Sequence, residues 1–569
     1  MKTKDPITTE VIRHSLETIA EEMRTALYRT AFTVVVKDML DYSCALFDRH
    51  GRLIATAIDI PTLIASMGSG LRAVIDKWEG RIDAGDVFLT NDPYNGGTHT
   101  PDVHIFIPIF DGKGERVGFA GNIAHHADWG GRVPGTVSAA NQSVYEEGVV
   151  YPAVKLEQRG ERNEAVYDTI VANLRQPDLN MGDLRAQLAA ARTGERRFAR
   201  LVERYGTEVV LGAIDDLIGH AGERTKQEVA ALPDGVYEAE GFLDDDGFNR
   251  GEPVRIHARI VIDGDSIVFD FSGCAEQTPG GMNCPLATTR SDVHYALKCI
   301  ISDDIPFNEG SMEAVEIIAP PGSIVNPGRP GATGDRHLTS QRVCDVTTRA
   351  LSQAAPEKGS AGWFSGWPFI ICESTSPKTG QSVVLLANIG GGAGAASSHD
   401  GADGVDIHGA NCAIIPAETV EVNYPLRVER YELIRDSGGA GRQRGGLGIR
   451  ADYRILSEQP IFFQSEVEQS KQDFAPAPID GGMPGSVSGV LLLGEDGEER
   501  PQDPKSVFEA RAGDVVSMRA GGGGGSGDPR QRDPELVEAD LRTGRISEQV
   551  ARELYRVEVA ADGGVARTE

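Results

Sequence analysis

Length, composition and charge set the first limits on this protein. The chain has 569 residues, more than the ~250–300 residues that one hydrophobic core usually reaches, so we expect several domains. It carries 85 acidic against 56 basic side chains, a formal charge of −29, which disfavours binding to nucleic-acid backbones and to anionic membrane surfaces.

Targeting signals and cysteine usage favour a cytoplasmic protein. The first residues lack the apolar core of a signal peptide, and no run of ~18 uncharged apolar residues occurs in the sequence. The seven cysteines are odd in number, scattered and never spaced as CxxC, so neither a disulfide framework nor a zinc ribbon is indicated. We therefore expect a soluble chain in a reducing compartment.

The first part of the chain is predicted to contain two helices and a pair of strands. Apolar residues recur at intervals of three and four over residues 8–33, which predicts an amphipathic helix with Thr8 or Thr9 as its N-cap. The segments SCALFD and RLIATA follow as strands around a turn. A second helix is predicted near residues 65–79, and a short strand at 87–90.

The next segment is predicted to form one β-hairpin. Its strands, VHIFIPIF and VGFAGNIAHH, are rich in β-branched and aromatic residues and flank the turn DGKGER. If the turn centres near Lys113, Asp102 lies opposite Ala124 or His125. A carboxylate and an imidazole then meet at the open end of the hairpin.

A metal site is predicted at this open end. His99 lies three residues before Asp102, in a glycine-rich turn that can fold its ring towards the same point. The resulting set of two histidines and an aspartate contains no thiolate and suits Zn²⁺, Mn²⁺ or Fe²⁺ in a site with open positions. His104 shares a strand face with Asp102 and is a further candidate, whereas His126 alternates to the other face. Any one of these histidines alone is more often an ordinary core or surface residue, so the hypothesis depends on their convergence.

The remaining sequence alternates helical and strand-rich blocks, so the expected fold class is α+β with several domains. Helices are predicted in SDVHYALKCIIS and TTRALSQAAPEK, and the long proline- and glycine-rich loop between them is of a kind that often carries function. The predicted divisions are an α+β metal-site region at 1–162, a helical segment at 163–235, a β-rich α+β domain at 236–382, a glycine-rich β domain at 383–530 and a helical tail at 531–569.

Glycine-rich segments fill the last predicted β domain. None forms a GxxxxGK[ST] phosphate loop, and none completes a dinucleotide-binding G-x-G-x-x-G unit with an acidic residue at the required distance. We interpret them as structural turns. The segment DSGGAGRQRGG, with Arg442 and Arg444 between glycines, is either a site for a carboxylate or phosphate or a solvated basic loop.

Seven segments stand in an order that is difficult to obtain by chance: EVIRHSLETIAEEM, DYSCALFDRHGRLIA, NDPYNGGTHTPDVH, AHHADWGG, FNEGSMEAVEIIAPPGSIVNP, DSGGAGRQRGGLG and GGGGGSGDPRQRDPELVEADLRTGRIS. They resemble the hydantoinase B / oxoprolinase family, the B-type subunits of ATP-dependent hydantoinases, lactamases and acetone or acetophenone carboxylases. The resemblance implies a hetero-oligomer in which an A-type subunit with an actin-like ATPase fold uses ATP and Mg²⁺ to activate the substrate. The B-type chain would bind a divalent metal and complete hydrolysis or carboxylation.

The resemblance also implies where the metal ligands lie. They are Asp41, His99, Asp102 and one histidine of the AHHAD segment. Between the two histidines of that segment, strand parity favours His125 over His126.

The expected reaction is the opening of a cyclic amide such as a hydantoin, lactam or 5-oxoproline ring. Phosphorylation turns the carbonyl oxygen into a leaving group, and a metal lowers the pKa of water towards ~7. His126 or Asp128 is expected to act as the general base or to orient it. The alternatives are a subunit of a ketone carboxylase, a non-catalytic structural subunit of such a complex, and a metal hydrolase that acts alone.

Overall fold

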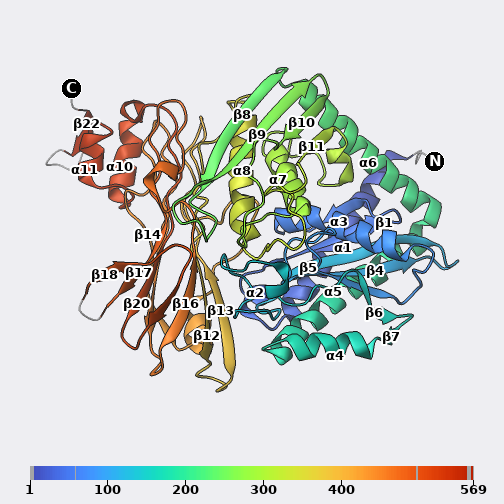
Figure 1. Ribbon diagram of the computed structural model, residues 1–569. Helices are drawn as coiled ribbons and strands as arrows, with labels where there is room; N and C mark the ends of the chain where they lie inside the picture. Colours follow the sequence, from blue (N-terminus) through green and yellow to red (C-terminus); the bar gives the residue numbers. More distant parts are fainter. Residues whose placement is uncertain (1–4, 58, 495–496, 560–564, 568–569) are drawn as a thin grey trace. The chain divides into compact units, whose positions relative to one another are not determined.

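The computed structural model describes residues 5–57, 59–494, 497–559 and 565–567 (Figure 1). The chain divides into two compact units, each of which mixes helices and sheets, and this confirms the predicted α+β, multidomain class. Unit 1 consists of Met1–Glu238, Ala258–Ser340 and Gly409–Ala413, and unit 2 of Ala239–His257, Gln341–His408 and Ile414–Glu569.

The main sheet of unit 1 has seven antiparallel strands in the order β2-β1-β5-β4-β3-β6-β7. The strands are β1 (Tyr42–Asp48), β2 (Leu53–Thr56), β3 (Val87–Thr90), β4 (Asp102–Phe110), β5 (Arg116–His125), β6 (Val154–Gln158) and β7 (Glu161–Arg162). The predicted hairpin is β4 with β5, in the middle of the sheet. Hydrogen-bonded neighbours on both sides therefore hold its register.

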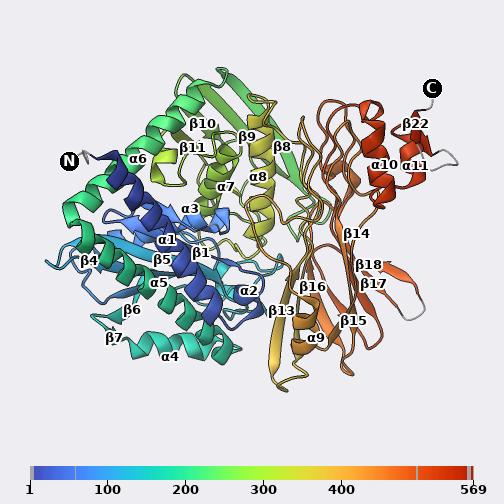
Figure 2. The same ribbon diagram turned by 180° about the vertical axis from the view of Figure 1, so that it is seen from behind.

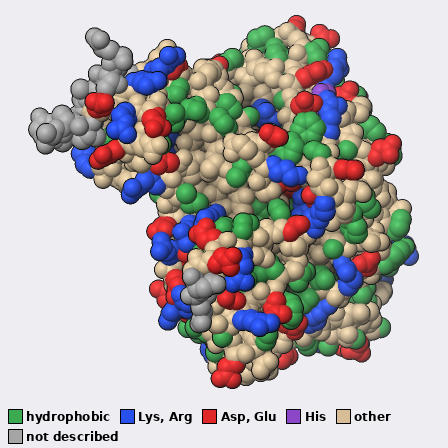
Figure 3. All heavy atoms as spheres, turned by 60° about the vertical axis from the view of Figure 1, so that its left-hand side comes forward, with side chains coloured by type: hydrophobic (Ala, Val, Ile, Leu, Met, Phe, Trp, Pro, Cys, Tyr) green, Lys and Arg blue, Asp and Glu red, His purple; other side chains and the backbone are tan. Residues whose placement is uncertain are grey.

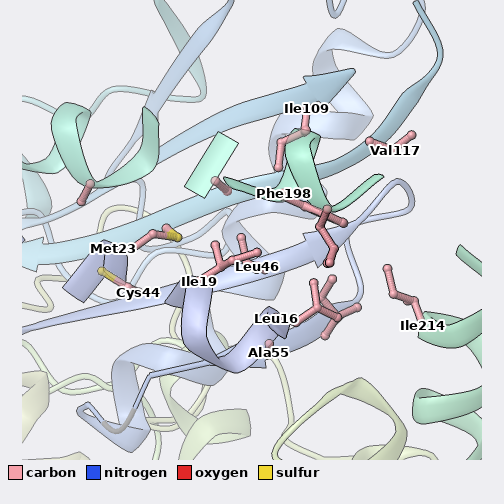
Figure 4. Packing of buried hydrophobic residues seen from close by; sticks show 14 of the residues in the cluster. Leu16, Ile19, Met23, Cys44, Leu46, Ala55, Ile109, Val117, Phe198 and Ile214 are labelled. Carbon is pink, nitrogen blue, oxygen red and sulfur yellow. The ribbon is translucent and has the colours of Figure 1, made fainter. Parts of the chain in front are cut away.

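Helices cover both faces of this sheet (Figures 1 and 2). Helices α1 (Pro6–Thr30) and α5 (Pro177–Tyr205) pack on one face, and α3 (Pro61–Trp78) packs on the other. Figure 4 shows part of the core under α1, where the following side chains meet: Leu16, Ile19, Met23, Leu46, Ile109 and Phe198. Full burial of a side chain of this size contributes about 1.5–3 kcal/mol. This packing therefore holds the sheet firmly in place, including the residues at the ends of its central strands.

Helix α1 begins earlier than the sequence pattern predicts. Asp5 is its N-cap and accepts the Ile7 N–H at 3.1 Å, and Pro6 occupies the first helical position. The predicted N-cap at Thr8 or Thr9 is wrong, because a carboxylate cap followed by a proline already provides the preferred start of a helix.

Further helices in the chain are α2 (Val34–Lys37), α4 (Glu164–Asn173), α6 (Thr207–Ala230), α7 (Leu286–Lys298) and α8 (Arg336–Ser352). The helical segment predicted at 163–235 contains α4, α5 and α6. Helix α8 starts at Arg336, so the prediction that RHLTSQR belongs to a loop is wrong. The start of α8 buries polar residues such as Thr339 and Ser340, and the apolar periodicity that reveals most helices is therefore absent.

A four-stranded sheet with the order β11-β10-β9-β8 follows α6 in the chain. It contains β8 (Gly235–Leu243), β9 (Val254–Asp263), β10 (Ser266–Asp270) and β11 (Val315–Ile318), and β10 runs parallel to β11. Strands β8 to β10 lie, apart from Gly235, within the segment from residue 236 that is predicted to be β-rich.

Unit 2 contains two antiparallel sheets, with the orders β13-β12-β16-β19 and β14-β15-β20-β17-β18. Their strands are β12 (Phe369–Thr375), β13 (Ser382–Asn388), β14 (Leu426–Leu433), β15 (Ile449–Ile455), β16 (Ile461–Glu466), β17 (Gly489–Leu493), β18 (Glu499–Pro501), β19 (Val507–Ala510) and β20 (Val515–Arg519). Helix α9 (Ala417–Asn423) precedes β14. The last part of the chain contains α10 (Pro534–Arg542), α11 (Glu548–Glu553), β21 (Val557–Val559) and β22 (Val565–Arg567).

The glycine-rich segments of unit 2 pack backbone against backbone. A Cβ added at Gly446 would lie 1.9 Å from the carbonyl oxygen of Ala402, and one at Gly523 would lie 1.9 Å from that of Ala393. The Gly446 N–H donates to the Ala393 carbonyl at 2.8 Å, and the Gly523 N–H donates to the Gly446 carbonyl at 2.9 Å. Glycine is required here because no other residue allows two backbone segments to approach so closely.

On the face drawn in Figure 3, Lys and Arg side chains are interspersed with Asp and Glu. Within the part of the chain that the structure describes, every helix is too short or too polar to cross a bilayer.

Candidate metal centre

Three side chains meet at the open end of the β4–β5 hairpin. Asp102 and His125 are direct register partners, which confirms one of the two predicted registers, and His99 lies in the turn before β4. The His99 Nε2 lies 3.1 Å from the His125 Nδ1, and the Asp102 Oδ1 lies 2.9 Å from the His125 Nδ1 and 3.2 Å from the His99 Nε2. These three potential ligand atoms form an almost equilateral triangle.

The triangle has the dimensions of ligands around one divalent ion. With metal–ligand distances of ~2.1 Å, two ligands lie about 3.0 Å apart at a right angle and about 3.4 Å apart at the tetrahedral angle. The observed separations are close to these values, and the three residues form the one cluster of this kind found among the described residues. Two imidazoles and one carboxylate fit Zn²⁺, Mn²⁺ or Fe²⁺ and leave positions open for other ligands.

The loop before α8 orients His99. The His99 Nδ1 lies 2.7 Å from the Gly334 carbonyl oxygen. Because a carbonyl oxygen only accepts hydrogen bonds, Nδ1 carries the proton and Nε2 turns its lone pair towards the triangle. Burial lowers the pKa of His99 to about 4, so the ring is neutral at physiological pH.

Two donors hold the second oxygen of Asp102. The Arg336 Nη2, at the start of α8, donates to Oδ2 at 2.7 Å, and the Thr98 hydroxyl donates to the same oxygen. Burial alone would raise the pKa of Asp102, but the positive charge of Arg336 and the hydrogen bond from His125 hold it well below its usual range. Asp102 is therefore a carboxylate with one oxygen committed to its neighbours and one directed into the triangle.

Asp41 borders the triangle beside His125. The backbone N–H of His125 donates to the Asp41 carbonyl at 3.0 Å. Burial opposes protonation of His125, but the hydrogen bond to Asp102 and the charge of Asp41 outweigh it and raise the pKa of His125. Burial raises the pKa of Asp41 to about 6. The Asp41 carboxylate is not one of the three closely spaced groups, and its role as a fourth ligand stays a prediction.

His104 and His126 lie outside the triangle. His104 stacks on Phe106 with ring centroids 5.7 Å apart. His126 lies on the opposite face of the sheet, where its Nε2 is 3.0 Å from the Gln187 Oε1 of α5. Its ring contacts that of Trp129, with ring centroids 4.7 Å apart. The strand alternation that separates His125 from His126 therefore appears in the contacts of the two rings.

Asp128 is engaged by the loop that follows β5. Its carboxylate accepts the N–H groups of Gly130 and Gly135, both at 2.9 Å, and pairs with the Arg175 Nη1 at 3.0 Å. These contacts close the loop on itself. The role of Asp128 or His126 as a general base stays a prediction.

Sequence reasoning missed three residues that shape this site: Thr98, Arg336 and Glu147. Glu147 is fully buried and accepts the Gly334 N–H at 2.7 Å and the Thr333 N–H at 3.0 Å. Burial raises the pKa of Glu147 to about 7, although these hydrogen bonds oppose the shift. The one available signal was the long proline- and glycine-rich loop, which was predicted to carry function but without any named residue.

Comparison with known proteins identifies the family. The family model described as Hydantoinase B/oxoprolinase matches residues 5–529. This chain belongs to the hydantoinase B/oxoprolinase family.

Three relatives illustrate the range of this family. The chain is 32% identical to the B-type subunit of the putative D-/L-hydantoinase of Pseudomonas sp. (strain NS671), over 98% of this chain and 96% of the relative. It is also 32% identical to the beta subunit of the caprolactamase of Pseudomonas jessenii, over 99% and 98% of the two chains. It is 30% identical to 5-oxoprolinase 1 of Arabidopsis thaliana over 92% of this chain, but spans 42% of that longer protein.

Two solved structures share its fold. The crystal structure of the ATP-dependent caprolactamase from Pseudomonas jessenii superposes with a TM-score of 0.91 at 30% identity, covering 99% of this chain and 98% of the other. The nucleotide-free structure of acetone carboxylase superposes with a TM-score of 0.90 at 18% identity, covering 100% and 82%. The second likeness shows a common fold alone.

In this hydantoinase B family chain, the two arginines of the DSGGAGRQRGG segment, Arg442 and Arg444, contact other residues of the same chain. Arg444 is buried and pairs with Asp403 at 3.0 Å and Asp540 at 3.4 Å. Arg442 donates to the Ser397 carbonyl at 3.0 Å. The solvated-loop interpretation is wrong for Arg444, because the carboxylates that neutralise it come from the same chain.

Proposed function

We propose that this chain is the metal-binding B-type component of an ATP-dependent enzyme that opens cyclic amides of the hydantoin, lactam or 5-oxoproline kind. The triangle of His99, Asp102 and His125 carries the proposal, because its spacing and donor set suit one divalent ion. Relatives named as hydantoinase, caprolactamase and 5-oxoprolinase proteins support the substrate class.

We also infer a second, ATP-using subunit. Two of the relatives are named as subunits, and the sequence contains no GxxxxGK[ST] phosphate loop. We assign ATP and Mg²⁺ to an A-type ATPase partner that activates the substrate carbonyl. The assembly would then be a hetero-oligomer, with activation on one subunit and ring opening on the other.

The metal would be held by His99, Asp102 and His125, with Asp41 as the proposed fourth ligand. When bound, Zn²⁺, Mn²⁺ or Fe²⁺ supplies Lewis acidity towards a carbonyl and lowers the pKa of water. Arg336 keeps the Asp102 carboxylate ionised and oriented.

His126 and Asp128 are the proposed base or orienting groups. The hydrogen bond of His126 to Gln187 and the pairing of Asp128 with Arg175 favour the orienting role, since both hold the segment that follows His125. A base would instead need its proton-accepting atom within reach of the substrate.

A ketone carboxylase subunit is the second candidate. It is favoured by the fold shared with acetone carboxylase, and it would use the same triangle. A non-catalytic subunit in which the metal only stabilises the fold is the third.

Activity of the assembled complex separates these candidates. The chain, purified with an A-type partner, would be tested for ATP-dependent consumption of hydantoin, 5-oxoproline, caprolactam, and acetone with bicarbonate. Asp102→Asn and His125→Ala should abolish turnover while assembly and ATP hydrolysis remain. Loss of assembly in both variants would support the structural role, and full turnover by either variant would contradict the proposed site.

A further inference from the structure

We propose that Glu147 is a positioning residue that determines which nitrogen of His99 carries the proton, and so prepares the triangle to bind metal. The inference rests on the proposed function, because it assigns Glu147 a task at the same site. Glu147 is not itself a proposed metal ligand and lies behind the loop that contacts His99.

The Glu147 carboxylate binds the backbone of two consecutive residues. Its Oε1 accepts the Gly334 N–H at 2.7 Å, both oxygens lie 3.0 Å from the Thr333 nitrogen, and Oε2 accepts the Thr333 hydroxyl at 3.2 Å. The carboxylate is fully buried, so these donors replace the water that it loses. The position of the segment 333–334 is thereby defined.

The same glycine that Glu147 holds is the one that contacts His99. The Gly334 carbonyl is the acceptor for the His99 Nδ1 proton at 2.7 Å. A side chain at position 334 would place its Cβ 2.9 Å from the Glu147 Oε1, so only glycine allows the carboxylate to come this close. Glu147, Gly334 and His99 therefore form one continuous line of contacts to the triangle.

Glu147 also holds the chain on the other side of His99. Its own carbonyl oxygen accepts the hydroxyl of Thr100, the residue after His99. The Glu147 side chain thus holds Gly334, whose carbonyl accepts from the His99 ring, and the Glu147 carbonyl holds Thr100, which follows His99.

Other contacts anchor the 329–336 loop independently. Arg329 pairs with Asp92 at 2.8 Å, and Arg336 binds Asp102 at 2.7 Å. A substitution at Glu147 should therefore disturb the Gly334 carbonyl without detaching the whole loop.

The chemical consequence concerns the lone pair of the His99 Nε2. With the Gly334 carbonyl in place, Nδ1 is protonated and Nε2 is free to bind a metal. Without it, the ring also takes the tautomer with a proton on Nε2, which cannot ligate through that atom. Partners that orient metal-binding histidines typically change metal affinity by about 10–100-fold, and for Glu147, one contact further away, we expect about tenfold.

The test is Glu147→Gln, which keeps the size of the side chain but replaces one acceptor oxygen by a donor. Glu146→Gln is the matched control, because Glu146 is partly exposed and pairs with the Arg132 Nε at 2.8 Å. Nitrogen NMR of the metal-free chain with ¹⁵N-labelled histidine, assigned with His99→Gln, reports the His99 tautomer. Calorimetric titration with Mn²⁺ or Zn²⁺ reports the affinity.

We expect the Nδ1-protonated form in the unsubstituted chain and in Glu146→Gln, and a mixture with about tenfold weaker metal binding in Glu147→Gln. An unchanged tautomer and affinity in Glu147→Gln would overturn the inference. If that variant does not fold, Thr333→Val, which removes one donor to Glu147, should shift the tautomer to a smaller extent, and no shift would overturn it equally. If the unsubstituted chain binds no metal, the proposed function fails, while the tautomer comparison still decides the role of Glu147.

Discussion

The candidate metal centre of unit 1 and an arginine cluster of unit 2, Arg444 and Arg545 with Asp403 and Asp540, both contain buried charged side chains but use them differently. At the candidate centre, one atom each of His99, Asp102 and His125 faces the other two, and neighbouring residues hold the outer atoms of His99 and Asp102. Around Arg444, each charge is matched by an opposite charge of the same chain. Buried charge and a distinctive motif are therefore not enough to indicate a ligand site; the convergence of ligating atoms is the distinguishing feature.

The largest predicted effect is a loss of stability when the close backbone packing beside Arg444 is disturbed. In Gly446→Ala the new Cβ would lie 1.9 Å from the Ala402 carbonyl, and a backbone atom cannot move aside as a side chain can. Overpacking usually costs 1–3 kcal/mol, and we expect a loss of at least about 3 kcal/mol in the free energy of unfolding, measured with urea. Gly489→Ala, which meets no atom within 4 Å, is the control. Equal losses in both variants would show that close packing is not the reason for these glycines.

Asp102→Asn tests the candidate metal centre. It removes the anionic ligand and leaves Arg336 without its partner, so metal affinity should fall by at least about 100-fold. Metal content after dialysis, measured by mass spectrometry, gives the result. Asp111→Asn, in the turn at the far end of the same hairpin, should retain the metal. Equal metal content in both variants would locate the metal elsewhere.

Metal binding should weaken as the pH falls. His125 must lose its proton to bind a metal through Nδ1, and its pKa is raised above the usual ~6.5, whereas His99, with a pKa of about 4, is already neutral. Below the pKa of His125 we expect about tenfold weaker binding for each pH unit.

The stability of the metal-free chain should change in the opposite direction and decrease as the pH rises. A raised histidine pKa contributes stability below ~6.5 that is lost as the pH rises through the folded-state value. The increase in melting temperature caused by metal should therefore be larger at pH 8 than at pH 6. An increase that is the same at both values would mean that His125 gives up no proton on binding.

Arg545→Ala should have the smallest effect. Its Nε pairs with Asp403 at 2.7 Å, but its side chain is 36% exposed and Asp403 also pairs with Arg444. Exposed ion pairs contribute about 0–1 kcal/mol, so we expect a loss below ~1 kcal/mol in urea unfolding and unchanged metal affinity. A larger loss would mean that the arginine cluster depends on each of its members.

The parts of the site that lie within one hairpin are predictable from the sequence. The turn near Lys113 predicts that Asp102 lies opposite Ala124 or His125, and the structure has His125 there. The alternation of the strands sends His126 to the other face. These inferences need only the period of a strand and the length of a turn.

The supporting residues are not predictable in this way. Glu147 and Gly334 are 187 residues apart in the chain, and Asp102 and Arg336 are 234 apart, so no local spacing connects them. Helix α8, which carries Arg336, shows no apolar periodicity because nearly all of its residues are buried and many of them are polar. Such pairs are determined by the way whole elements pack, which a local pattern does not contain.

The most direct test of the metal centre is anomalous diffraction from crystals of the chain loaded with Mn²⁺ or Zn²⁺. The proposed site predicts one strong peak within bonding distance of the His99 Nε2, the Asp102 Oδ1 and the His125 Nδ1. A peak at other residues, or none at the triangle in the metal-loaded protein, would contradict it.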